Sequence, residues 1–232
     1  MHLYVMPEHI KERVLLRQGK LFSHDTIDAA RTALIVVDMQ NYFVAEHFAQ
    51  SVPLSRAIVP NINRLAKALR EAGGTVIWIQ TTATGALQHW GRHHEHMLTP
   101  ERVEKRLAGL ADGSDGFQIY PKLEVSPADI RVKKIKYSAL IGDSSNLLDL
   151  LKQRGIESVL VTGTATNVCC ESNARDAMLL DFRVVMVSDG NASWTDDEHA
   201  ATLNSCAVFF GDVMTTGEVI GRLLPAAQRK SA

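Results

Sequence analysis

The sequence predicts an α/β protein with a doubly wound, Rossmann-like sheet of six mainly parallel strands and helices on both faces. Two observations lead to this prediction. Apolar, β-branched runs such as residues 32–38 have the length of strands that are buried on both faces. Segments with helical periodicity, such as residues 58–72, alternate with these runs, as in a parallel sheet. The 232 residues contain no internal repeat or linker, so we expect an N-terminal arm at 1–30 and a single domain at 31–232.

Six segments have the composition of strands. The first, residues 32–38, is a continuous apolar run that ends in an aspartate, which is unusual in a buried strand. The second, residues 75–80, follows a helical segment, so the first two strands form a right-handed βαβ unit. The remaining expected strands are residues 130–136, 158–161, 183–189 and 207–210.

The expected helices carry start and stop signals. In residues 58–72 apolar side chains recur at i, i+3, i+4 and i+7, and two glycines follow. Two capping boxes, each a threonine followed three residues later by a glutamate, open the last two helices. Apart from a helix at 99–110, residues 81–129 are expected to be irregular, and residues 225–232 frayed. The other expected helices are residues 8–18, 146–154, 171–180, 195–204 and 215–224.

The composition excludes several classes of protein. Apolar residues make up 46% and charged residues 22%, which is ordinary for a globular protein with a core. A net charge of −1 offers no basic surface for nucleic acid, and no apolar run is long enough to span a membrane. Cys169, Cys170 and Cys206 form no disulfide framework, and the N-terminus lacks the pattern of a secretory signal. We therefore expect a cytoplasmic protein with a small-molecule ligand and neither a nucleic-acid nor a membrane partner.

A candidate nucleophile follows the fourth strand. Cys169 lies where a turn of small residues, 162–167, leads into a helix. The partial positive charge of a helix N-terminus favours a thiolate, which is the nucleophilic form of cysteine. Free cysteines are also among the most buried residues, so this stretch alone fits a small buried side chain equally well. For the adjacent Cys170 we expect a role in helix packing rather than in chemistry.

Two further reactive residues lie at the ends of other strands. Asp38 closes the first strand, and Lys134 lies near the end of the third. Ligands of parallel sheets bind at the carboxyl ends of the strands, so this topology brings Asp38, Lys134 and Cys169 to one edge. Each residue also has a simpler role open to it, Asp38 in capping a helix and the lysine in solvent. Lys136 lies on the same face as Lys134, so strand alternation does not choose between them.

Together the three residues explain how a thiol could become a nucleophile at neutral pH. An ordinary thiol has a pKa near 8.5, so a thiolate at pH 7 needs about 2–3 kcal/mol of stabilisation. A helix N-terminus contributes about 0.3–1 kcal/mol at an exposed site. A neighbouring lysine and an aspartate that accepts the thiol proton can supply the rest.

Three motifs in this order resemble the isochorismatase-like cysteine hydrolases. The resemblance covers roughly residues 32–224, and its order of three separate motifs makes it specific. The motifs are ALIVVDMQN at 33–41, KIKYS at 134–138 and VTGTATNVC at 161–169.

The resemblance implies an isochorismatase-like fold and assigns roles to residues of this chain. It implies a catalytic triad of Asp38, Lys134 and Cys169, and so selects Lys134 over the other lysines. It also implies a cis peptide bond between Thr164 and Ala165, which aims the N–H groups of Ala165 and Cys169 at an oxyanion. Such an oxyanion hole stabilises the tetrahedral intermediate of acyl transfer.

Within the family, the ATNVC form looks most like the ureidoacrylate-type amide hydrolases. Nicotinamidases usually carry Asp in place of Asn167, and they bind a metal through an Asp-x-His motif that residues 80–84 lack. The histidines of residues 89–96 show no matching ligand spacing, so we expect no metal and no cofactor. Family members that cleave isochorismate lack the nucleophilic cysteine, so Cys169 argues against that reaction.

We therefore expect a cysteine hydrolase that cleaves the C–N bond of a small amide, ureido or carbamoyl substrate through a thioester, and forms a homo-oligomer (dimer or tetramer). One alternative is a family hydrolase of a non-amide bond in which Cys169 is not essential. The other is a non-enzymatic, flavodoxin-like ligand-binding protein, which the bulky residues 39–43 disfavour because a phosphate loop is rich in glycine. Specificity is expected to come from residues 81–129. Candidates for the pocket wall, on position alone, are Asn41, Phe43, Gln80, Trp90, Tyr137 and Asn167.

Overall fold

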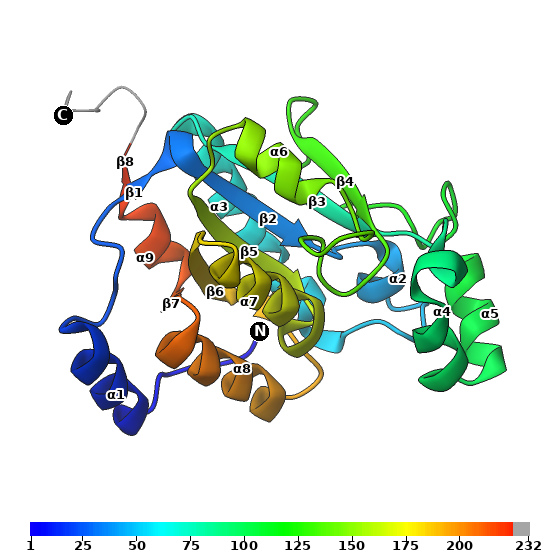
Figure 1. Cartoon of the computed structure of the whole chain (residues 1–232), viewed down its shortest axis with the longest axis horizontal. Coiled ribbons are helices and arrows are strands. Elements are labelled where there is room, and N and C mark those ends of the chain that lie inside the picture. Colours follow the sequence, from blue (N-terminus) through cyan, green and yellow to red (C-terminus); the bar gives the residue numbers. More distant parts are fainter. Residues whose placement is uncertain (225–232) are drawn as a thin grey trace.

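A six-stranded parallel sheet forms the centre of the computed structural model, which describes residues 1–224 (Figure 1). Its strands follow the order β4-β3-β2-β5-β6-β7, so the chain starts in the middle and winds outwards in both directions. The expected tail at 225–232 lies outside the described residues. The predicted fold class is confirmed. The strands are β2 (Thr32–Val37), β3 (Thr75–Thr81), β4 (Ile130–Lys134), β5 (Ser158–Thr164), β6 (Arg183–Ala192) and β7 (Asp212–Met214).

Helices cover both faces of the sheet, because alternate residues of the buried strands point to opposite sides. Every residue of β2 is buried: Ile35 packs into the core on one face and Leu34 into the core on the other. The first face carries α6 (Leu147–Gln153), α7 (Glu171–Leu179) and α8 (Asp196–Phe209), with α1 (Glu8–Gln18) packed on α8. The second face carries α3 (Val59–Glu71) and α9 (Thr216–Ile220).

Helix α3 shows how the sequence specifies such a layer. Ile62, Leu65 and Leu69 recur at helical spacing and are fully buried. Burying a side chain of this size contributes about 1.5–3 kcal/mol relative to leaving it exposed. The helix then stops, because Gly73 adopts a positive φ of 89° that other residues rarely take. No helix within residues 1–224 is long and apolar enough to cross a membrane.

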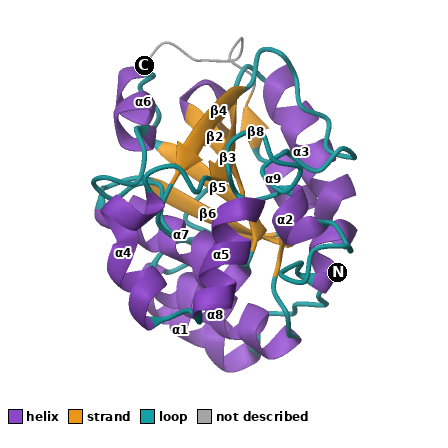
Figure 2. Cartoon of the chain, turned by 90° about the vertical axis from the view of Figure 1, so that its right-hand side faces the viewer, coloured by secondary structure: helices purple, strands orange, loops and turns teal. Residues whose placement is uncertain are grey.

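Two helices project beyond the carboxyl ends of the strands, next to α2 (Asn41–Val44) (Figures 1 and 2). They are α4 (Ala86–His96) and α5 (Pro100–Gly109). Helix α4 was not expected, since these histidine-rich residues were predicted to be irregular, and it kinks at Trp90, where φ is −144°. Both helices therefore lie at the edge of the sheet where the candidate residues were placed.

The predicted strand at residues 207–210 is wrong. Residues 207–209 form the last turn of α8, with Ala207 and Val208 buried, and the N–H of Phe210 donates to the carbonyl of Cys206 at 2.8 Å. The β-branched and aromatic composition of the segment is therefore overridden by helix packing. The strand comes after it, as β7. The last helix ends at Ile220 rather than 224, and Leu223–Leu224 (β8) pair with Ile27–Asp28 (β1).

Candidate active site

The register of the strands places Asp38 and Lys134 side by side. Val37 pairs with Gly163 on one side of β2, while Thr81 at the end of β3 pairs with Lys134 at the end of β4. Asp38 follows Val37 directly and takes a left-handed φ of 55°, which aspartate tolerates better than most residues. Its N–H donates to a carbonyl of β3 at 3.0 Å. The end of the sheet therefore fixes the backbones of both Asp38 and Lys134.

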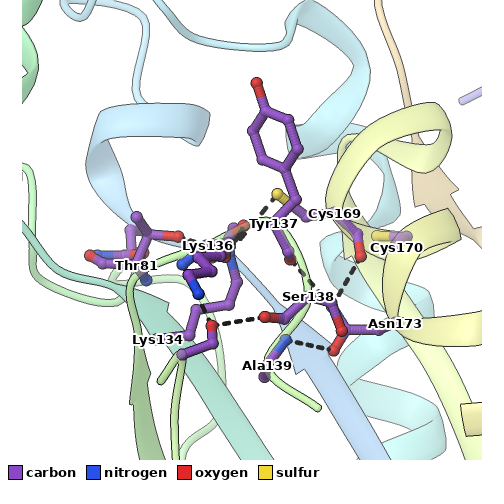
Figure 3. Close-up of polar contacts among 12 residues, drawn as sticks. Thr81, Lys134, Lys136, Tyr137, Ser138, Ala139, Cys169, Cys170 and Asn173 are labelled. Atoms are coloured by element: carbon purple, nitrogen blue, oxygen red, sulfur yellow. Dashed lines mark hydrogen bonds and ion pairs between the residues drawn. The ribbon is translucent and has the colours of Figure 1, made fainter. Parts of the chain in front are cut away.

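Lys134 is the centre of a buried polar network (Figure 3). Its Nζ lies 2.9 Å from Oδ2 of Asp38, and each side chain is 1% exposed. Nζ also donates to Oγ1 of Thr81 at 2.7 Å, and this hydroxyl donates to Oδ1 of Asp38 at 2.8 Å. The carbonyl of Lys136 accepts a further hydrogen bond at 3.1 Å. Burial lowers the pKa of Lys134, but its interaction with Asp38, and any negative charge on Cys169, outweigh burial and raise the pKa overall, so the lysine stays protonated.

Cys169 completes this cluster. It lies in a π-helical turn, Thr166–Cys170, between β5 and α7, and its Sγ is 3.6 Å from Nζ of Lys134. Burial raises the pKa of the Cys169 thiol to about 12, and the negative charge of Asp38 adds to this, while Lys134 acts in the opposite direction. The resting side chain of Cys169 is therefore a neutral thiol beside Asp38. The sequence had suggested a thiolate favoured by the helix N-terminus, and burial outweighs that effect.

The turn before Cys169 depends on close backbone packing. Gly163 has a φ of 119°, and a Cβ at this position would lie 2.0 Å from the carbonyl oxygen of Val37. Only glycine fits such an approach. The peptide bond between Thr164 and Ala165 is cis, the geometry that the resemblance implies.

Asn173 on α7 joins Cys169 to the loop after β4 (Figure 3). Its Nδ2 donates to the carbonyl of Cys169 at 2.7 Å and to that of Tyr137 at 3.3 Å. Its Oδ1 accepts from the N–H of Ala139 at 3.0 Å. The side chain is fully buried, so these partners replace water for all its polar atoms. The sequence had not singled out Asn173, because a lone asparagine on a helix carries no recognisable signal.

A cavity of about 250 Å³ opens above the cluster. This is smaller than the ~300–1,000 Å³ that is typical of pockets for drug-sized ligands, so the site suits a small molecule. Lys134 is not among the residues that line it. The expected site residues that do line the cavity are Asp38, Phe43, Tyr137, Thr164, Ala165 and Cys169.

Comparison with known proteins decides the family. The family model described as "Isochorismatase domain" matches residues 32–218. The chain belongs to the isochorismatase family. It is 32% identical to the ureidoacrylate amidohydrolases RutB of Variovorax paradoxus, over 86% of this chain and 84% of that protein, and of Agrobacterium fabrum, over 87% and 94%. A solved structure described as a cysteine hydrolase from Pseudomonas syringae pv. phaseolicola superposes with a TM-score of 0.77 at 31% identity, covering 85% of this chain and 94% of that one.

The family assignment confirms the resemblance inferred from the three motifs and makes the chain a hydrolase of this family. It leaves the alternative of a non-enzymatic, flavodoxin-like binding protein without support. The oligomeric state, the cellular location and the division into an arm and a domain stay predictions.

Four of the expected pocket-wall residues do not line the cavity of this isochorismatase-family chain. Their side chains have partners elsewhere. Asn41 donates to Oδ1 of Asp115 at 3.0 Å, and Gln80 to the carbonyl of Phe117 at 2.9 Å. The Trp90 ring stacks on His93 with centroids 3.8 Å apart, and Asn167 accepts from Oγ of Ser193 at 2.6 Å.

Other cavity residues were missed by sequence reasoning. Most come from segments around the sheet edge whose folding was not foreseen. The i, i+4 spacing of two arginines on the helix expected at 99–110 was the one signal available in the sequence. These residues include Tyr42, Gln50, Arg102, Arg106 and Trp194.

The histidine side chains of helix α4 do not converge on one point. His93 lines the cavity, where burial and then the charge of Arg106 lower its pKa to about 4. His94 is buried, and its Nδ1 lies 3.1 Å from the carbonyl of Trp90. Among residues 1–224 no group of three or more His, Cys, Asp or Glu side chains is placed to hold a metal ion.

Proposed function

We propose that the chain hydrolyses the C–N bond of a small amide, ureido or carbamoyl compound, with Cys169 as the nucleophile. One observation carries this proposal: Asp38, Lys134 and Cys169 meet at the base of a small cavity, with Nζ of Lys134 2.9 Å from Asp38 and 3.6 Å from Cys169. Two relatives at 32% identity are named ureidoacrylate amidohydrolases, which supports chemistry of the same kind here.

The first half of the reaction forms a thioester. Because the resting thiol is neutral, Asp38 accepts its proton as Sγ attacks the carbonyl carbon. The carbonyl oxygen becomes an oxyanion, for which the N–H groups of Ala165 and Cys169 serve as donors. A donor of this type is worth about 2.7–4 kcal/mol in other enzymes. The ammonium of Lys134 holds Asp38 in place and stabilises the negative charge on sulfur as it develops.

The second half releases the products. The protonated Asp38 returns its proton to the nitrogen of the breaking C–N bond, and ammonia or an amine leaves. The thioester remains on Cys169. Asp38, again a carboxylate, takes a proton from a water molecule that attacks the thioester carbonyl. Collapse of this second tetrahedral intermediate returns the proton to sulfur and frees the acid.

The proposal is tested by trapping the covalent intermediate. Ammonia release is screened with small amides and ureido acids, and the enzyme is then acid-quenched during turnover and digested for mass spectrometry. We expect acylation of the peptide that carries Cys169, and loss of turnover in Cys169→Ala. Cys206→Ala is the matched control, because Cys206 is equally buried but lies on α8 away from the cavity. Turnover that persists in Cys169→Ala would instead support a hydrolase in which this cysteine is a bystander.

A further inference from the structure

Two arginines of helix α5 reach the cavity that holds Cys169. Arg102 and Arg106 are four residues apart, so both lie on the same side of the helix. No residue of α5 is fully buried, so the helix is not held in place by a large apolar face. Arg102 is exposed and Arg106 is half-buried. The two arginines therefore add positive charge to the cavity and contribute little to the packing of the core.

The positive charge of these arginines is not balanced within the cavity. Within residues 1–224, Asp38 is the one acidic residue that lines the cavity, and its charge is already paired with Lys134. Neither Arg102 nor Arg106 forms an ion pair with a carboxylate anywhere in residues 1–224. Arg102 instead donates to Oε1 of Gln50, a neutral group, at 3.1 Å. Unpaired guanidinium groups in a cavity wall suit an anionic ligand, because charge-assisted hydrogen bonds from arginine to a carboxylate are strong.

Lys105 on the same helix shows the contrast. Its Nζ lies 2.6 Å from Glu101, and both side chains are largely exposed on the outside of α5. The charge of Arg106, in comparison, acts on the cavity itself. Burial is the largest cause of the lowered pKa of His93, and the charge of Arg106 is the next. The same charge acts against burial, which raises the pKa of Tyr137.

We propose that Arg102 and Arg106 bind a carboxylate of the substrate, so that the site takes amide or ureido acids in preference to neutral amides. This rests on the proposed function. The planar guanidinium offers paired N–H donors that match a carboxylate, which makes arginine suited to this task. The substrate lies with its scissile carbonyl at Cys169 and its carboxylate towards α5. Phe43 and Tyr137, which also line the cavity, flank the short chain between these two groups.

The experiment compares pairs of probes that differ in charge but hardly in shape. One pair is succinamate and levulinamide, in which a methyl group replaces one carboxylate oxygen. The other is N-carbamoyl-β-alanine and its methyl-ketone isostere. We expect the acids to have a kcat/KM about 10- to 100-fold above that of the ketones, as for a hydrogen bond to a charged group. Arg106→Met lowers this ratio towards one by raising KM for the acids, and Arg102→Met lowers it less because Arg102 is more exposed.

Lys105→Met is the matched control, since it removes the same charge from the same helix but leaves the cavity unchanged. Arg106→Lys keeps the charge and loses the paired donors, so it recovers part of the preference. Thermal unfolding of each variant confirms that it is folded. An equal kcat/KM for acid and ketone in the wild type, or an equal loss for both probes in Arg106→Met, overturns the proposal.

Binding separates this proposal from the proposed function. Calorimetry with Cys169→Ala measures the affinity for succinamate and levulinamide without any reaction. We expect Cys169→Ala to bind succinamate more tightly than levulinamide, and the double variant with Arg106→Met to lose this preference. Such a result supports the anion site even where the wild type hydrolyses neither probe and the proposed function fails. Equal affinity for succinamate and levulinamide, or no binding of succinamate, overturns the anion site whatever the wild type hydrolyses.

Discussion

Lys134 and Asp38 form an ion pair that is closed off from solvent: Nζ lies 2.9 Å from Oδ2, and each side chain is 1% exposed. Removing one partner from such a pair leaves an uncompensated buried charge, which typically costs about 3–5 kcal/mol. We therefore expect Lys134→Met to lower the free energy of unfolding by this amount, measured by urea denaturation, and to abolish hydrolysis.

The control for this variant is the neighbouring lysine. Lys133 forms an exposed ion pair with Asp112, so Lys133→Met should cost less than about 1 kcal/mol. The double variant Asp38→Asn with Lys134→Met removes both charges and should recover much of the lost stability while remaining inactive. Equal losses for Lys133→Met and Lys134→Met would show that the buried pair contributes nothing special to the fold.

The buried thiols predict a loss of stability at high pH. Burial raises the pKa of Cys169 and of Cys206 to about 12, from an ordinary value of about 8.5–9. In the unfolded chain these thiols ionise near pH 9, whereas in the folded protein they keep their protons. The unfolded state then binds fewer protons, so the free energy of unfolding falls as the pH rises from about 9 towards 12.

This fall is measured by urea unfolding under reducing conditions at a series of pH values. Each thiol contributes a slope of up to about 1.4 kcal/mol per pH unit. Cys206→Ala should therefore reduce the slope above pH 9 by one thiol's share, relative to the wild type. An unchanged slope in this variant would mean that Cys206 ionises as readily in the folded protein as in the unfolded chain.

Much of this architecture follows from local patterns in the sequence. Strand β2 follows from its continuous apolar run and helix α3 from its apolar periodicity, because burial sets both patterns. The meeting of Asp38, Lys134 and Cys169 was predicted from topology and from resemblance to a family, because parallel strands share one carboxyl edge. Residues 207–210 show where local patterns fail, since the same apolar run suits a strand or the buried face of a helix.

The cavity wall was harder to predict, because it depends on contacts between distant segments. Trp90 was a candidate by position, but the kink in α4 stacks its ring on His93 instead. Arg106 comes from a helix without fully buried residues, so no core periodicity marks which side faces the site. The raised pKa of the Cys169 thiol was also out of reach, since it results from burial rather than from the position of the residue before a helix.

Gly163 provides a test of the packing between β2 and β5. A Cβ at this position would lie 2.0 Å from the carbonyl oxygen of Val37, and its φ of 119° is strained for any other residue. Because backbone atoms of a buried strand cannot move aside, we expect Gly163→Ala to cost more than about 3 kcal/mol of unfolding free energy. Gly155→Ala is the control: its φ of 63° is also positive, but no atom lies within 4 Å, so it should cost about 1–2 kcal/mol. Similar losses for the two variants would rule out the close approach as the cause.

Asn173 connects the nucleophile to the loop that carries Tyr137. Asn173→Ala removes hydrogen bonds to the carbonyls of Cys169 and Tyr137 and to the N–H of Ala139, and leaves these groups without their partner in the core. A buried polar group without a partner costs about 1–3 kcal/mol, so we expect the unfolding free energy to fall by about 2–4 kcal/mol. Release of the loop and of the turn at Cys169 should also lower kcat/KM, measured by ammonia release.

Asn63→Ala is the control for Asn173→Ala, because Asn63 also forms hydrogen bonds to backbone groups but lies away from Cys169. Its side chain donates to the carbonyl of Lys122 and accepts from the N–H of Glu124, both at 3.0 Å, on the surface of the molecule. Water replaces these bonds in Asn63→Ala, so this variant should lose less than about 1 kcal/mol and keep its kcat/KM. If Asn173→Ala loses stability but retains full kcat/KM, Asn173 serves the core alone and does not position Cys169 for attack.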